Sequence, residues 1–195
     1  MAAIAPLKIK ILILGPPKSG KTTIANYLAD SSDISLNVYR PTQALLKGVR
    51  IVEFESNELE LNGERVDAEI ELWDCSGDRK YKRCWPAVRR NADGVILVCR
   101  PDDDKGSALL PWYEEFVQRG NIDPSLVLVL LHTTNDPSSS AVIDDTINTE
   151  SYLLPQMSGF RVIPLNINRD DDNLRLEFNA FLCRVIQNVK FQKVE

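Results

Sequence analysis

The chain has 195 residues, of which 44% are hydrophobic and 26% are charged, as is typical of a soluble globular protein. This length predicts one domain, spanning residues 1–195, rather than two. The net charge of −5 gives no reason to expect nucleic acid or an anionic membrane surface as a partner. The four cysteines lack C-x-x-C spacing and only one histidine accompanies them, so neither a zinc site nor a disulfide framework is expected.

Short apolar segments alternate with helical patterns along most of the chain. Six segments are predicted to be strands: 9–14, 49–55, 68–73, 94–99, 126–131 and 161–165. Helices are predicted over 21–29, 106–120 and 170–189. The second and third strands are joined through Asn62-Gly63, a strong signal for a hairpin. We therefore expect a three-layer α/β fold, in which a mostly parallel six-stranded sheet has helices on both faces.

Several predictions concern the placement of side chains and loops. Trp85 and Trp112 are expected in the core, although an aromatic at position 85 could also anchor a partner. The polar region 133–157 is long for a connection, so a partly ordered loop or a surface insertion is expected. The basic cluster, formed by the run 79–83 and by Arg89-Arg90, favours a solvated face over a binding surface. In the last helix one buried face is predicted to contain Leu174, Leu176, Phe178, Phe181, Leu182, Val185, Ile186 and Val189.

The most informative motif fits the phosphate-binding loop (P-loop) pattern G-x-x-x-x-G-K-[ST] and lies between a predicted strand and a predicted helix. In such a loop, backbone N–H groups surround the phosphates of a nucleotide, and the helix N-terminus adds partial positive charge. Lys21 is expected to reach the β- and γ-phosphates, and the Thr22 hydroxyl is expected to bind Mg²⁺. The predicted nucleotide-binding residues here are Gly15, Pro16, Pro17, Lys18, Ser19, Gly20, Lys21, Thr22 and Thr23.

Two further segments follow the P-loop. Asp74 ends an apolar strand and precedes Gly77 in the pattern D-x-x-G. Such an aspartate can hold Mg²⁺ through water, and the glycine lets a backbone N–H approach the γ-phosphate. Thr42 lies in the polar loop 31–43, where it is expected to contact Mg²⁺ only when the third phosphate is present. Each signal is weak alone, and their order along the chain makes them informative.

In this order the motifs resemble the small GTPases of the Ras and Rab kind, over residues 8–190. The chain resembles one divergent branch of these proteins more closely, the Rab-like GTPase subunits of intraflagellar transport complex B. The resemblance implies the P-loop small-GTPase fold, GTP or GDP with Mg²⁺, coiled-coil subunits of that complex as partners, and a location in the cytoplasm and the cilium or flagellum. It is carried by Ser31-Ser32-Asp33-Ile34, Pro41-Thr42-Gln43, Gly48-Val49-Arg50-Ile51-Val52-Glu53-Phe54-Glu55, Glu71-Leu72-Trp73-Asp74-Cys75-Ser76-Gly77-Asp78 and Cys84-Trp85-Pro86-Ala87.

The chain departs from the small-GTPase pattern at its catalytic and base-reading positions. Asp78 replaces the glutamine that orients the attacking water. An ionised aspartate cannot donate and repels the γ-phosphate, so slow hydrolysis is predicted and no catalytic residue is assigned. The base-reading motif N-K-x-D is replaced by residues 132–136, of which Asn135 or Asp136 could reach guanine. The later Ser-Ala-Lys contact becomes Leu165-Asn166-Ile167-Asn168, so selection of guanine over adenine is left open.

Three functions fit these features. The favoured one is a structural subunit that binds GTP and Mg²⁺ and hydrolyses GTP slowly or not at all. No prenylation or myristoylation signal is present, so we expect no direct membrane anchor and localisation through a protein partner. A switching GTPase that needs an external activator is the second reading, and a nucleotide-independent scaffold is the third. A P-loop kinase is disfavoured because 133–157 contains no arginine or lysine for a lid.

Overall fold

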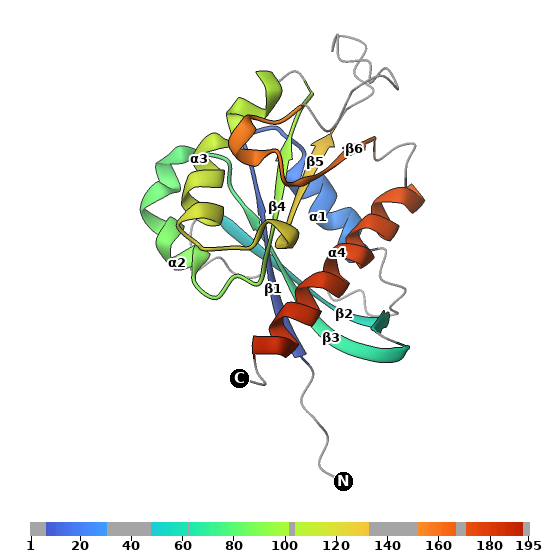
Figure 1. Cartoon of the computed structure of the whole chain (residues 1–195). Coiled ribbons are helices and arrows are strands. Elements are labelled where there is room, and N and C mark those ends of the chain that lie inside the picture. The colour runs from blue at the N-terminus through green and yellow to red at the C-terminus, as the bar shows by residue number, and fades with distance from the viewer. Residues whose placement is uncertain are drawn as a thin grey trace.

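The computed structural model describes residues 7–30, 48–61, 63–101, 104–132, 152–166 and 171–192. Within them, six strands form one sheet in the order β2-β3-β1-β4-β5-β6 (Figure 1). Among these strands β2 and β3 pair antiparallel, and every other neighbouring pair is parallel. The prediction of a mostly parallel sheet is confirmed. The strands are β1 (Leu7–Leu14), β2 (Val49–Leu61), β3 (Glu64–Cys75), β4 (Gly94–Cys99), β5 (Val127–His132) and β6 (Arg161–Leu165).

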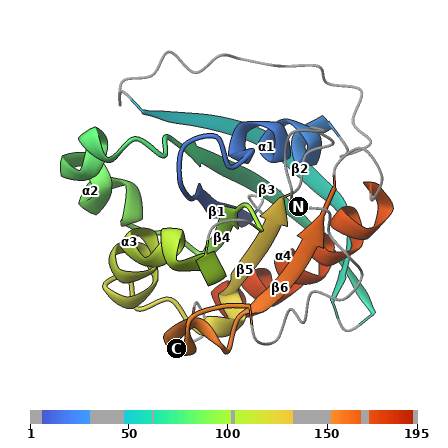
Figure 2. The same cartoon turned by 90° about the horizontal axis from the view of Figure 1, so that it is seen from above.

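Helices cover both faces of the sheet, which confirms the three-layer arrangement. Helices α1 and α4 lie on one face, and α2 and α3 lie on the other (Figures 1 and 2). Successive side chains of a strand point to opposite faces, so Ile11 and Ile13 of β1 pack in the core under α1 and α4, while Leu12 packs in the core under α2 and α3. The helices are α1 (Lys21–Asp30), α2 (Trp85–Arg89), α3 (Leu110–Trp112) and α4 (Asp171–Gln192). No helix within the described ranges has the length and apolar character needed to span a membrane.

The hairpin of β2 and β3 extends further than the sequence predicted. Its pairing runs from Val49 opposite Cys75 to Leu61 opposite Glu64, with a shift in register between Ser56 and Leu59. Gly63, in the turn, has a φ of 80°, which a glycine adopts without strain. The hairpin carries β2 along the whole outer edge of β3, down to the end of β3 where Asp74 lies.

Lys10 explains why a charged residue interrupts the apolar run of β1. Its Nζ donates to the carbonyl oxygens of Val88 at 2.7 Å and Arg90 at 2.8 Å, where the last carbonyls of α2 lack partners within the helix. The ammonium group also lies 3.7 Å from the centre of the Trp73 ring, a favourable cation–π distance. Burial lowers the pKa of Lys10. Lys10 therefore fixes the end of α2 against the sheet.

The helix predicted over 106–120 is irregular. A 3-10 turn (Asp104–Leu109) leads into α3, and a π-helical turn (Tyr113–Gln118) follows it. Pro111 stands in the first turn of α3, where its missing N–H costs nothing. Trp85 and Trp112 are both buried, and the Trp85 ring lies 6.0 Å from Trp112 and 5.3 Å from Phe116. The core placement of both tryptophans is confirmed.

Helix α4 corrects one prediction. Leu174, Phe178, Phe181 and the apolar residues of the next turn are buried, but Leu176 is 69% exposed. At 3.6 residues per turn, position 176 lies about 200° around the helix from 174, so it faces away from the sheet. The prediction that Leu176 belongs to the buried face was wrong. Most of the polar region 133–157 lies outside the described residues.

Candidate nucleotide-binding site

The P-loop lies between the end of β1 and the start of α1, as the sequence predicted. Gly15 and Gly20 have φ angles of 145° and 95°, which favour glycine. A Cβ at Gly15 would lie 2.0 Å from the carbonyl oxygen of Val98 on β4, so the loop is pressed against the neighbouring strand. The loop ends at the first turn of α1, whose unpaired N–H groups favour an anion.

Lys21 is held inside this loop. Its side chain is only 6% exposed, and its Nζ donates to the carbonyl oxygen of Pro16 at 2.6 Å and to Ser19 Oγ at 3.3 Å. Burial lowers the pKa of Lys21, and the nearby Asp74 carboxylate opposes this shift. An ammonium group has three protons to donate. A phosphate in the loop would complete the set of partners of a cation that is already removed from water.

Thr22 and Asp74 form the part of the site that fits a metal ion. The Thr22 hydroxyl donates to Asp74 Oδ2 at 2.7 Å. The two meet because β1 and β3 are parallel neighbours, with Ile13 opposite Asp74. No group of three or more His, Cys, Asp or Glu side chains in the described part of the chain could hold a metal. Mg²⁺ commonly uses one or two protein oxygens and completes its shell with phosphates and water, so this pair fits it.

Gly77 brings the segment after β3 against the P-loop. A Cβ at Gly77 would lie 2.4 Å from the backbone N of Pro17 and 2.6 Å from the carbonyl oxygen of Gly15. Real Cβ atoms do not approach backbone this closely, so only glycine fits. The two segments predicted to contact the phosphates are therefore neighbours in space.

Asp78, the residue in place of the usual glutamine, is engaged with Lys80. Its Oδ1 accepts from the backbone N–H of Lys80 at 2.9 Å, and its Oδ2 lies 2.6 Å from Lys80 Nζ. The hydrogen bonds from Lys80 lower the pKa of Asp78. The carboxylate is thus ionised at neutral pH, and an ionised carboxylate accepts hydrogen bonds but donates none.

His132 lies against the P-loop, although the sequence analysis placed it only in the segment 132–136 that replaces N-K-x-D. It is the last residue of β5, and its Nδ1 donates to the carbonyl oxygen of Ser19 at 3.0 Å. Its ring lies so close to the P-loop that a Cβ at Gly20 would be 2.1 Å from Nδ1. The available signal was its position, since His132 stands where the asparagine of N-K-x-D is expected.

The other predicted residues are distributed differently. Pro17 and Lys18 are exposed on the outside of the loop, and Lys18 has a φ of 63°. Thr23 is also exposed. Ser19 is fully buried beneath the loop. The predicted metal contact Thr42 and the predicted base contacts Asn135 and Asp136 lie outside the described residues, so those roles stay predictions.

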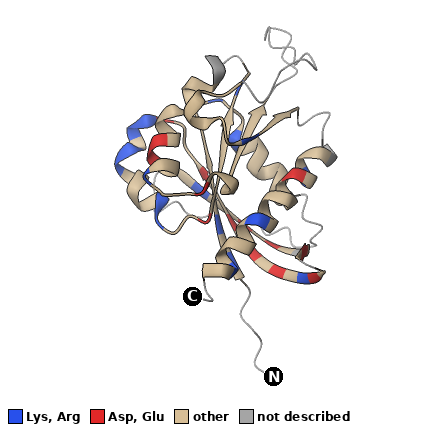
Figure 3. Ribbon diagram, in the orientation of Figure 1, with Lys and Arg blue, Asp and Glu red and all other residues tan. Residues whose placement is uncertain are grey.

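A cleft and a basic surface adjoin the P-loop. The cleft has a volume of about 650 Å³ and lies between Pro17, Asp78 and Trp112. Beside it, the 3-10 turn Arg79–Cys84 and α2 carry the basic cluster seen in the sequence (Figure 3). We call this the basic surface; its exposed members are Arg79, Lys80, Lys82, Arg83 and Arg90.

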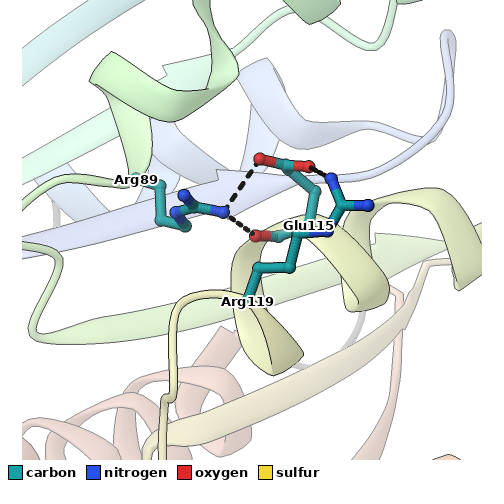
Figure 4. A network of polar contacts seen from close by, with 3 residues as sticks. All are labelled: Arg89, Glu115 and Arg119. Carbon is teal, nitrogen blue, oxygen red and sulfur yellow. Dashed lines mark hydrogen bonds and ion pairs between the residues drawn. The ribbon is translucent and has the colours of Figure 1, made fainter.

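Arg89 differs from the exposed side chains of the basic surface because its ion-pair partner is a buried carboxylate. Its Nη1 donates to the backbone oxygen of Glu115 at 3.0 Å and to its Oε1 at 2.9 Å (Figure 4). Arg119 donates to Oε2 of the same carboxylate at 2.7 Å. Glu115 is buried, so its charge needs such partners. The network ties α2, which follows the Gly77 segment, to the π-helical turn after α3.

The strand order, the P-loop and the Thr22–Asp74 pair define a protein of the Ras-like GTPase class. In agreement, residues 10–135 match the model of Roc, the Ras of Complex domain of DAPkinase. The chain is 39% identical to intraflagellar transport associated protein 2 of Caenorhabditis elegans, covering 91% of this chain and 79% of that protein. It is 36% identical to the human intraflagellar transport protein 22 homolog, covering 94% and 92%. The chain belongs to the intraflagellar transport protein 22 family.

Two crystal structures are similar over nearly the whole fold. GTP-bound IFT22 of T. brucei is 30% identical with a TM-score of 0.62, covering 91% of this chain and 95% of that one. The GTP-bound T. brucei IFT22/74/81 structure gives a TM-score of 0.67 at 30% identity, covering 95% and 98%. The resemblance to Rab-like subunits of intraflagellar transport complex B is thereby confirmed.

Proposed function

We propose that this chain binds GTP or GDP with Mg²⁺ and acts as the Rab-like subunit of an intraflagellar transport B complex. Its place would be the cytoplasm and the cilium or flagellum, where it supports assembly and transport. The observation that carries the proposal is the 2.7 Å contact of Thr22 with Asp74, next to the buried Lys21 ammonium group. T. brucei IFT22 has been solved in GTP-bound and GDP-bound forms, which supports a guanine nucleotide.

We further propose that the chain hydrolyses GTP slowly or not at all. Asp78 is an anion paired with Lys80, and a carboxylate has no N–H to donate to the charge that develops during hydrolysis. Ordering of the Gly77 segment by the γ-phosphate would then persist, and a partner could recognise that state without frequent cycling.

The partners we propose are coiled-coil subunits that correspond to IFT74 and IFT81, because T. brucei IFT22 was solved together with these proteins. The basic surface lies next to Gly77, so it could read the nucleotide state and pair with acidic side chains of a partner. In this proposal a protein partner localises the chain, with neither nucleic acid nor a membrane anchor of its own.

The first test is calorimetric titration of the full chain with GTP, GDP and ATP in the presence of Mg²⁺. The wild type should bind the guanine nucleotides in preference to ATP. Lys21→Ala should weaken binding at least about a hundredfold, because a charged hydrogen bond to phosphate is lost. Lys18→Ala is the matched control, since Lys18 is exposed on the same loop, and it should stay within about threefold of the wild type. Equal binding of ATP would overturn the guanine assignment.

A second test addresses the partner. The full chain is co-expressed with the counterparts of IFT74 and IFT81 from the same organism, and complex formation is measured by size-exclusion chromatography. Lys21→Ala should reduce incorporation while the isolated variant stays folded. Undiminished incorporation of a variant that has lost nucleotide would instead support the nucleotide-independent scaffold.

A cycling GTPase is the remaining candidate, and the existence of both GTP-bound and GDP-bound forms of T. brucei IFT22 favours it. Such a switch would need an activator that supplies the missing donor in trans, as an arginine finger does. Single-turnover hydrolysis by the chain alone and in its complex separates the two. A complex that accelerates hydrolysis by at least about a thousandfold would establish the cycling switch.

A further inference from the structure

Arg50 lies at the metal end of the site, within the segment 48–55 that carried the family resemblance, where no role was predicted for it. It is the second residue of β2, and the antiparallel register places it opposite Asp74. Its Nε is 3.6 Å from Asp74 Oδ2, the same oxygen that accepts the Thr22 hydroxyl. One carboxylate oxygen is therefore shared by a guanidinium group and by the hydroxyl that fits Mg²⁺.

The guanidinium group is held in place from the other side. Arg50 Nη2 donates to Asn26 Oδ1 of α1 at 2.7 Å. Its Nε is buried and has no hydrogen-bond partner within the described residues, because 3.6 Å is too long for a hydrogen bond. A buried donor without a partner is unfavourable. Nε therefore interacts with the Asp74 carboxylate through charge and not through a hydrogen bond, as expected of a cation that neutralises Asp74.

We propose that Arg50 is a built-in counter-charge for Asp74 that lowers the affinity of the site for Mg²⁺. The proposal rests on the nucleotide-binding function proposed above. A cation this close to Oδ2 repels a divalent ion at the Thr22–Asp74 pair and competes with it for the carboxylate. When no metal is present, Arg50 neutralises the buried Asp74 and keeps it aligned with Thr22. The site therefore stays organised across a wider range of Mg²⁺ concentration.

The proposal is tested by Mg²⁺ titration of the GDP-loaded full chain, with retention of a fluorescent GDP analogue as the readout. In Arg50→Gln, the Mg²⁺ concentration for half-maximal retention should fall about tenfold. Arg50→Lys keeps the charge and should stay within about twofold of the wild type. The matched control is Arg65→Gln, an exposed position on β3, which makes the same charge change away from Asp74. Equal midpoints for Arg50→Gln and Arg65→Gln would overturn the proposal.

A measurement without nucleotide separates this proposal from the function on which it rests. The thermal midpoints of the wild type, Arg50→Gln, Asp74→Asn and the double variant are compared in excess chelator. A counter-charge predicts that the double variant melts higher than the sum of the two single shifts implies. Additive shifts would overturn the counter-charge. If the wild type bound no nucleotide, the proposed nucleotide-binding function would be overturned. The comparison of the four thermal midpoints would still show whether Arg50 and Asp74 interact.

Discussion

His132 Nδ1 lies 3.0 Å from the carbonyl oxygen of Ser19, so the end of β5 holds the P-loop through a side chain. The contact requires a residue without a side chain at position 20, because a Cβ there would overlap the imidazole ring. The P-loop is thus positioned by β4 at Gly15 and by β5 at Gly20.

Replacing His132 tests this support. His132→Leu leaves the Ser19 carbonyl oxygen without its hydrogen-bond donor. The free energy of unfolding should therefore fall by about 1–3 kcal/mol, and nucleotide binding should weaken. His132→Asn supplies a shorter donor and should recover part of both losses. Urea unfolding and nucleotide titration measure the two quantities. Equal losses in both variants would show that the ring acts through its bulk rather than its hydrogen bond.

The same residue predicts a pH dependence of stability. Burial lowers the pKa of His132 below 6.5, opposed by the Ser19 hydrogen bond and assisted by the nearby Arg100. Between the folded pKa and 6.5 the unfolded chain binds more protons than the folded chain. The contribution of His132 to the free energy of unfolding is therefore complete above about pH 6.5 and is lost as the pH falls below it. Unfolding at about pH 7.5 and about pH 5.5 should show a smaller difference for His132→Asn than for the wild type. Equal changes in the free energy of unfolding between the two pH values in both proteins would contradict the role of His132 in the pH dependence.

Asp78→Gln should raise the rate of GTP hydrolysis. The substitution restores an amide that can orient the attacking water and removes a negative charge near the γ-phosphate, which we expect to be worth at least about tenfold. Asp78→Asn is the control, because it removes the charge but has a shorter reach. Single-turnover assays on GTP-loaded protein give the rates. A rate unchanged by Asp78→Gln would mean that this position does not limit hydrolysis.

The Glu115 network should contribute unequally to stability. Arg89→Ala leaves the buried Glu115 carboxylate without its less exposed partner, so we expect a loss of about 2–3 kcal/mol in the free energy of unfolding. The Arg119 side chain is 69% exposed, against 25% for Arg89, so Arg119→Ala should cost less than about 1 kcal/mol. Chemical denaturation measures both. The reverse ranking would show that α2 is held by other contacts.

Gly77→Ala should separate the segment after β3 from the P-loop, because a Cβ at this position overlaps the loop backbone. The basic surface, which follows directly, should then be cleaved faster by trypsin. Gly159→Ala is the matched control, since a Cβ there meets no atom within 4 Å. Limited proteolysis followed by mass spectrometry locates the cuts. Unchanged cleavage at 79–83 would show that the segment is held independently of Gly77.

The sequence by itself determined the local features of this protein. The pattern from Gly15 to Thr22 identified the P-loop, and Asn62-Gly63 identified the hairpin. The strand ending at Asp74 and the D-x-x-G spacing predicted a metal position and a phosphate position, and the structure places both residues beside the P-loop. These features could be read because each depends on residues that are near neighbours in the chain and obey a local period or turn geometry.

Tertiary structure alone decided which distant residues complete the site. His132 and Ser19 are 113 residues apart, and Arg50 reaches Asp74 only through the register of β2 on β3. Leu176 is a different case, because the helical period alone places it on the opposite side of α4 from Leu174, as its exposure confirms. Strand order and register result from packing the whole sheet against two layers of helices. No local pattern encodes them, and they determine which charges and hydrogen bonds surround the P-loop.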